Sequence, residues 1–428
     1  MNDESRQPTE YDLVLGGNNP PPVDGLVLGG IAEIKRRLES NNIEIIKSAL
    51  SDAIAYQEKG LDLVINALYN TPQEIRQHAV SILRYHKTPK AEQALLDYDP
   101  NSLFVRFSDW NLKDFNLESY LDEPVNTAYR IDLDKFSSII SELKKIEPQG
   151  SKIEALYLPM WSDWAWDCDR GKSVSYKECI DLLLDAHQQL PNLKALFLAD
   201  DTSDSYAWGS RSDYKRYKIC MEEVCYLLEA YPNLELLHLQ GRDGLELSKI
   251  KHNNLKSLVI ESRDLCDRAL EEVFSLNLPK LEYLELWLGA DYEYRRKRYH
   301  GGNNISLLAN LFRSLLSKQL FTNLKYLGLC SCEWANDLVY LLKDNSIINK
   351  LRILNLSKGT LTDEGAEILL NCPAVNKLHT LDVSMNLLST EMIHKLSQLD
   401  CNVIAEPQDV PERGEESCGY ERYSALYE

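Results

Sequence analysis

A six-residue hydrophobic motif recurs eight times in the chain and constrains its fold more than any other feature of the sequence. Each copy has an apolar residue, two variable residues, a leucine, one variable residue and a final apolar residue. The copies are IEALYL (153–158), LKALFL (193–198), LELLHL (234–239), LKSLVI (255–260), LEYLEL (281–286), LKYLGL (324–329), LRILNL (351–356) and LHTLDV (378–383). Such repetition indicates an array of similar units rather than several unrelated domains.

The motif and its surroundings predict a strand followed by a helix. Its last two apolar residues are two positions apart, so they share one face of a short strand. Helical patterns such as YKECIDLLLDAHQQ (176–189) and DEGAEILL (363–370) separate the copies. A Pro-Asn pair or a similar helix stop introduces several of the copies. We therefore expect an α/β leucine-rich-repeat solenoid: a horseshoe with a parallel sheet and outer helices. Cys332 and Asn386 occupy the Asn/Cys turn position of this repeat, Cys332 as a buried thiol, whereas Gly359 departs from it.

The residues before the motifs follow another period. Between 29 and 96, apolar residues recur at i, i+3, i+4 and i+7, which predicts a small all-α module of paired helices of the HEAT-repeat type. Gly60 is expected to end one helix, and Thr71-Pro72 to begin another. The segment 126–148 predicts a strand followed by a helix. The expected domains are an extended Gly/Pro arm (1–28), HEAT-like repeats (29–96), a transition or cap (97–150), the horseshoe (151–405) and an acidic tail (406–428).

Three gaps between motifs are longer than the others and predict a binding surface. Successive motifs start 40, 41, 21, 26, 43, 27 and 27 residues apart, and the extra residues fall at 159–175, 199–216 and 287–303. Insertions at one point of a solenoid repeat emerge along one edge, so we expect a composite rim. Tryptophan, tyrosine and arginine, which often dominate binding energy, are concentrated there. The predicted partner-binding residues are Trp161, Trp164, Trp166, Trp208, Tyr294, Arg295 and Arg298; the alternative is that these aromatics pack against their own repeats.

Particular stretches resemble known families. LPKLEYLELWLGADYEY (278–294), LSKGTLTDEGAEILL (356–370), IESRDL (260–265) and RYSALYE (422–428) resemble a functionally uncharacterised bacterial family of ribonuclease-inhibitor-like leucine-rich-repeat proteins, over about residues 125–428. The segment 12–100, with PPPVDGLVLGG and GLDLVINAL, resembles HEAT-repeat modules of cyanobacterial type. The resemblance implies a scaffolding role and carries over no catalytic residues.

Searches for catalytic, cofactor and metal motifs predict none. DRGKS (169–173) lacks the first glycine of a phosphate loop, because position 166 is Trp. Cys330-Ser331-Cys332 is too short for a zinc clip. His187, His238, His379 and His394 are scattered through the repeats and are expected to be structural. We therefore expect no cofactor, no metal and no catalytic residue.

Composition limits the classes of partner. The chain has 47 basic and 66 acidic residues, a net charge of −19, which argues against binding to nucleic acids or anionic membranes. The sequence shows neither a signal peptide nor an apolar run long enough for a membrane span, and its cysteines are expected to be reduced thiols in a cytoplasm. The predicted function is a non-enzymatic scaffold or adaptor that binds a protein through the concave strand face and the rim. The alternative is a ligand-binding or enzyme component with a site under the three insertion loops.

Overall fold

The computed structural model describes residues 30–69, 71–116, 127–146, 152–159, 176–199, 221–241, 244–262, 265–289 and 321–408. The chain divides into two compact units, Met1–Phe104 and Val105–Glu428, which we name the helical unit and the sheet unit.

Helices form the described part of the helical unit. Asn42 caps the second helix by accepting hydrogen bonds from the backbone N–H groups of Glu44 and Ile45, and Thr88 caps the fifth by accepting from Ala91. The helices are α1 (Ile31–Leu38), α2 (Ile43–Ala53), α3 (Gln57–Asn66), α4 (Gln73–His86) and α5 (Pro89–Tyr98), with 3-10 turns at Ile54–Tyr56 and Pro100–Leu103. The HEAT-type assignment of these helices stays a prediction.

One of the two predicted helix boundaries in this unit is wrong. Thr71-Pro72 does precede a helix, because α4 begins at Gln73 with Pro72 as its N-cap residue. Gly60, however, lies inside α3 rather than at a helix end. Its missing side chain allows close packing: a Cβ atom there would lie 1.7 Å from the carbonyl oxygen of Ala53. Close packing, not helix termination, explains this glycine.

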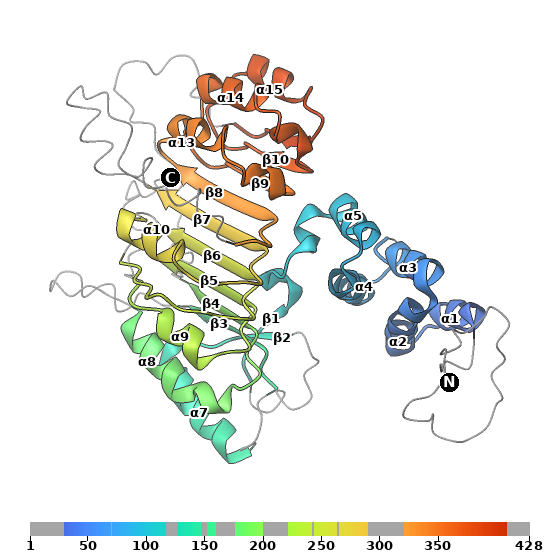
Figure 1. The fold of residues 1–428 in the computed structure, drawn as a ribbon. Helices are drawn as coiled ribbons and strands as arrows, with labels where there is room; N and C mark the ends of the chain where they lie inside the picture. Colours follow the sequence, from blue (N-terminus) through green and yellow to red (C-terminus); the bar gives the residue numbers. More distant parts are fainter. Residues whose placement is uncertain are drawn as a thin grey trace, which may run out of the picture. The chain divides into compact units, whose positions relative to one another are not determined.

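The sheet unit contains one parallel sheet of eleven strands, arranged in the order of the sequence (Figure 1). The eight motifs form the strands β3 to β10, as predicted. The sheet also includes three strands without the motif: the exposed β1, the adjacent β2 and the short β11. The strands are β1 (Asn111–Asp114), β2 (Thr127–Arg130), β3 (Ala155–Pro159), β4 (Ala195–Ala199), β5 (Leu236–Gly241), β6 (Ser257–Ser262), β7 (Tyr283–Gly289), β8 (Tyr326–Cys332), β9 (Ile353–Asn355), β10 (Thr380–Asp382) and β11 (Asn402–Ile404).

Helices lie along one side of this sheet (Figure 1). They are α7 (Leu133–Ile146), α8 (Lys177–Ala186), α9 (Cys225–Ala230), α10 (Asp267–Val273), α13 (Ala335–Leu342), α14 (Asp363–Leu370) and α15 (Thr390–Leu396). β2 and α7 are the strand and helix expected within 126–148. Strands followed by helices in a parallel sheet make a leucine-rich-repeat-like solenoid, which confirms this part of the predicted fold class.

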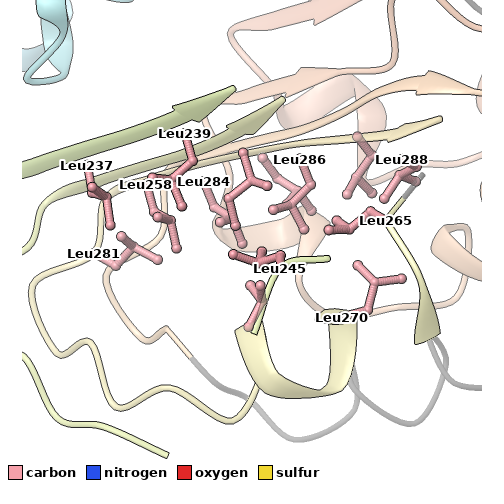
Figure 2. Packing of buried hydrophobic residues seen from close by; sticks show 14 of the residues in the cluster. Leu237, Leu239, Leu245, Leu258, Leu265, Leu270, Leu281, Leu284, Leu286 and Leu288 are labelled. Carbon is pink, nitrogen blue, oxygen red and sulfur yellow. The ribbon is translucent and has the colours of Figure 1, made fainter. Parts of the chain in front are cut away.

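The motif leucines form the core between sheet and helices. Leu258, Leu284 and Leu327 pair across β6, β7 and β8, and all are 2% exposed or less. Figure 2 shows this layer from β5 to β7, with Leu270 of α10 directed into it. Burying one leucine contributes roughly 1.5–3 kcal/mol, so repetition of one motif stabilises the whole array.

One backbone geometry recurs at the end of β8 and in the turns after β9 and β10. Ser331, Lys358 and Met385 lie at equivalent positions and have φ values of 52°, 62° and 51°. The next residue is the Asn/Cys position of the repeat. Cys332 is buried there, as predicted, and so is Asn386. At Gly359 a Cβ atom would lie 3.1 Å from Asn386 Oδ1 and 3.0 Å from the Cys332 carbonyl oxygen, so the missing side chain leaves room for both neighbours.

His252 replaces a backbone hydrogen bond of the repeat with its ring. In neighbouring units the N–H of the first motif leucine donates to a carbonyl three residues earlier, as Leu234 does to Tyr231. Leu255 N–H instead donates to His252 Nδ1 at 2.9 Å, while His252 Nε2 donates to the Tyr231 carbonyl at 3.1 Å. These partners fix the neutral ring, and burial lowers the pKa of His252 below its usual 6.5.

The buried His252 predicts a loss of stability in mild acid. Above pH ~6.5 both states hold a neutral ring; below it the unfolded chain takes up a proton that the folded protein resists. The free energy of unfolding should therefore fall as the pH drops from about 6.5 through the folded pKa, by up to ~1.4 kcal/mol per pH unit. Urea unfolding at several pH values should show that a His252→Asn variant lacks this pH-dependent loss of stability. The control His394→Asn, at an exposed histidine, should retain it. Equal pH profiles in all three proteins would contradict the assignment.

Candidate functional site

Trp161, Trp164, Trp166, Trp208, Tyr294, Arg295 and Arg298 all lie outside the described residues, so their role stays a prediction. The expected starts of all three insertions are wrong: Pro159 is the last residue of β3, Ala199 is the last residue of β4, and β7 continues past Trp287 to Gly289. Trp287 therefore lies on a strand, where the pleat turns it to the face opposite the core.

That face, opposite the helices, is named the strand face. It carries the residue between the two last apolar residues of each motif, and the residue two positions later. Polar and aromatic side chains occupy most of these places. The main residues are Arg130, Tyr157, Phe197, His238, Gln240, Val259, Glu261, Glu285, Trp287, Gly328, Cys330, Asn355 and Asp382.

The chain itself covers the first part of the strand face. Val105 packs against Ala128, Ala155, Ala195 and Leu236 on successive strands, where three alanines leave room for another backbone. The Ser257 hydroxyl donates to the Val105 carbonyl oxygen at 2.6 Å. The Phe107 and Trp110 side chains also pack against this cluster. The segment Val105–Trp110 is therefore a fixed part of the face over β2 to β6.

An aromatic row leads from this segment to a half-buried histidine–carboxylate hydrogen bond. The rings of Tyr157 and Phe197 lie 4.8 Å apart edge to face, and Phe197 stacks on His238 at 4.0 Å. His238 Nε2 lies 2.9 Å from Glu261 Oε1, and Gln240 donates to the other carboxylate oxygen at 3.0 Å. Burial alone would raise the pKa of Glu261, but the hydrogen bond and charge of His238, with the Lys358 charge, lower it. Glu261 is therefore ionised at neutral pH.

Glu285 is the centre of the next cluster. Its Oε2 accepts hydrogen bonds from the hydroxyls of Tyr283 and Tyr326, the latter at 2.7 Å, and its Oε1 accepts from Trp287 Nε1 at 2.9 Å. The two tyrosine rings stack with centroids 3.8 Å apart. Burial, followed by the Glu285 charge, raises the pKa of both tyrosines, so their hydroxyls stay protonated donors. All three donors are neutral, and the described residues give Glu285 no ion pair.

Gly328 makes this arrangement possible. It faces Glu285 across the β7–β8 pair, and a Cβ atom there would lie 2.8 Å from Glu285 Cγ and 3.0 Å from a ring carbon of Tyr326. Any side chain at this position would displace the carboxylate or the ring. The glycine therefore gives Glu285 the space to lie flat between its donors.

Lys358 closes the cluster from the turn after β9. Its ammonium nitrogen lies 4.0 Å from the centroid of the Trp287 ring, the geometry of a cation–π contact. Among the described residues, the ammonium group contacts this ring and forms no ion pair. Asp382 lies on β10 with its carboxylate accepting from Ser384. The cluster thus combines fixed aromatic rings, carboxylates and one movable lysine.

The chemistry of these groups suits binding rather than group transfer. Burial, followed by the Glu285 charge, raises the pKa of the Cys330 thiol well above its usual value, so it is a poor nucleophile at neutral pH. The Ser257 hydroxyl is committed to the Val105 carbonyl. Within the described ranges, no group of three His, Cys, Asp or Glu side chains is placed to hold a metal ion.

Sequence reasoning treated His238 as structural and did not single out Glu261, Glu285, Trp287 or Lys358. A signal was nonetheless present. Aligning the eight motifs and reading only the residue between the two final apolar positions gives Tyr, Phe, His, Val, Glu, Gly, Asn and Asp. That column predicts an aromatic first half and a polar second half of the strand face, but not the bonds among them.

Comparisons with known proteins support the fold. No family model and no curated protein matches the sequence. The structure is similar to a crystal structure of a Bacteroides fragilis protein, a structural-genomics target, with 25% identity, coverage of 73% of this chain and 81% of that chain, and a TM-score of 0.53. Weaker likenesses are to the TLR13–ssRNA13 complex (13% identity, 72% of this chain, 35% of that chain, TM-score 0.32) and an internalin from Listeria monocytogenes (14% identity, 60% and 68%, TM-score 0.27).

The helices in the described ranges include none long and apolar enough to span a bilayer.

Proposed function

We propose that this protein is a non-enzymatic scaffold that binds another protein through the strand face from β7 to β10. The observation that supports this proposal most directly is the Glu285 cluster, in which two tyrosines and one tryptophan fix a carboxylate on the face opposite the helices. Rings and charges already held in place lose little conformational entropy on binding, which is why preorganised surfaces bind well. Tyrosine and tryptophan are also the residue types that most often dominate protein interfaces.

The segment that covers one part of the strand face supports this proposal. Because Val105–Trp110 occupies the region over β2 to β6, a partner meets the half-buried groups from β7 to β10, including Glu285, Asn355 and Asp382. A composite rim of the three insertions would extend the same surface, with Trp161, Trp164, Trp166, Trp208, Tyr294, Arg295 and Arg298 as contacts. The HEAT-type module at 29–96 would offer a second binding surface. A reducing cytoplasm fits the free cysteines of the described residues.

Quantitative partner capture tests the proposal. The full chain, immobilised, is compared with Trp287→Ala, with the charge reversal Asp382→Lys, and with Tyr340→Ala on the helical side, where the tyrosine is 47% exposed. Removing a central aromatic residue typically costs an interface about 2 kcal/mol or more, so recovery of a specific partner should fall at least about tenfold with Trp287→Ala. Asp382→Lys should also reduce recovery, and Tyr340→Ala should match the wild type.

Thermal unfolding of each variant separates a lost surface from a lost fold. If all four folded proteins recover the same partners in the same amounts, the strand face is not the binding surface. The alternative from the sequence, a ligand or enzyme site under the insertion loops, would then gain, because that site requires neither Trp287 nor Asp382.

A further inference from the structure

The ring of Trp287 is in contact with a cation from the same chain, the ammonium group of Lys358. Lys358 reaches it from a turn residue with φ of 62°, a conformation shared with Ser331 and Met385 in the adjacent repeats. The backbone geometry is therefore a property of the repeat, and only the lysine side chain is particular to this turn. Its ammonium rests on the indole without an ion pair among the described residues, so a stronger cationic ligand can replace it.

The surroundings of that cation are acidic. Glu285 accepts hydrogen bonds from neutral donors only, and the positive charges near its cluster are Lys358 on the Trp287 ring and Arg106, whose charge acts on Tyr283. Glu261 pairs with Trp287 on the neighbouring strand β6, Asp382 lies on β10 beyond the Lys358 turn, and Lys358 interacts electrostatically with Glu261. A cation placed over Trp287 is thus attracted both by the ring and by carboxylates on both sides.

We infer that the occupant of the strand face is a basic segment of a partner protein, whose lysine or arginine side chain displaces Lys358 from Trp287 and pairs with Glu285. This inference rests on the proposed function and names the chemistry of the partner. Charge complementarity carries it: the surface offers the Glu285 carboxylate, which accepts hydrogen bonds from neutral donors only, beside an aromatic ring that already accepts a cation. The net charge of −19 would also accelerate the approach of a basic partner.

Binding of defined peptides to the purified full chain tests the inference. The probe is a fluorescein-labelled Gly–Lys repeat peptide, with Gly–Glu and Gly–Ser repeats of equal length as controls, measured by fluorescence anisotropy at physiological salt. The wild type should bind the Gly–Lys peptide alone. Glu285→Gln, which keeps the shape and most hydrogen bonds, should weaken binding about tenfold, as loss of one partner of a charge pair typically does.

Lys358→Gly should change peptide binding in the opposite direction. Glycine accepts the positive φ of this turn, so the variant removes the internal cation without straining the backbone. It should strengthen peptide binding about threefold or more, because the ligand no longer competes with Lys358. Met385→Gly is the matched backbone control in the next repeat and should have no effect. Glu391→Gln and Lys395→Ala, exposed on α15, control for the change in net charge.

The outcomes separate the alternatives. Equal weakening by Glu285→Gln and Glu391→Gln would mean adhesion by net charge and would overturn the inference. Binding of the acidic or neutral peptide instead would overturn it as well. A surface occupied by a second copy would appear as a dimer in sedimentation that Glu285→Gln dissolves, and it would also exclude this occupant. If capture depends on Trp287 while the basic peptide does not bind, the proposed function stands and only the inference about charge fails.

Discussion

Replacing Gly60 by alanine should destabilise the helical unit by about 3 kcal/mol or more, although the same change usually strengthens a helix. Alanine exceeds glycine in helix propensity by roughly 1 kcal/mol. At Gly60 the added methyl group would lie 1.7 Å from the carbonyl oxygen of Ala53 and 2.6 Å from its carbonyl carbon. Overpacking typically costs about 1–3 kcal/mol, and more when backbone must move. Because both blocking atoms are backbone, the steric cost exceeds the propensity gain.

A second helical glycine supplies the matched control. Gly365 lies inside α14, and a Cβ atom there would also be crowded, at 2.4 Å from Asn336 Oδ1 and 2.6 Å from Leu361 Cδ1. Both obstacles are side-chain atoms, which can shift. Urea unfolding followed by circular dichroism should therefore show a clearly smaller loss for Gly365→Ala than for Gly60→Ala. A Gly60→Ala variant as stable as the wild type would show that α3 does not pack so closely against the end of α2.

The Gly60 example illustrates which parts of the fold can be predicted from the sequence. The eight motifs specify β3 to β10, because the spacing of Leu284 and Leu286 directly encodes which face is buried. β1 and β11 carry no such pattern: Leu112 is half exposed, and pairing with a neighbouring strand, not burial, makes these residues strands. Gly60 was misassigned for a related reason, since its role depends on a contact with Ala53 that no local pattern records.

The candidate site divides in the same way. That Glu285 and His238 face away from the core follows from their places between motif leucines. That Glu285 is held by Tyr283, Tyr326 and Trp287 does not, because those bonds require the register of β7 against β8 and the space left by Gly328. The covering segment Val105–Trp110 was likewise beyond prediction, because it contacts strands far along the chain, including Ser257.

Replacing the buried Asn386 by leucine should cost about 4 kcal/mol and loosen both the turn that carries Lys358 and the turn that follows Asp382. The side chain is fully buried, and its Oδ1 accepts from the Leu361 N–H at 2.9 Å. Its Nδ2 lies 2.9 Å from the Leu356 carbonyl oxygen and 3.1 Å from those of Val383 and Ser384. Leucine fills nearly the same volume but bonds none of these groups. Each unsatisfied buried group costs about 1–3 kcal/mol, so the combined loss is large even when neighbours relax.

The control for this change is Asn371→Leu, on an exposed asparagine at the end of α14. Its amide donates to a single carbonyl, that of Glu367, in contact with solvent. Water can replace that bond, so the expected loss is below about 1 kcal/mol. Unfolding in urea gives both values, and hydrogen exchange at Leu361 N–H reports the turn directly. Asn386→Leu should speed that exchange, whereas unchanged exchange with unchanged stability would mean that the turn is held by its backbone alone. Because Lys358 and Asp382 lie on either side of this turn, the leucine variant should also weaken binding of the Gly–Lys peptide.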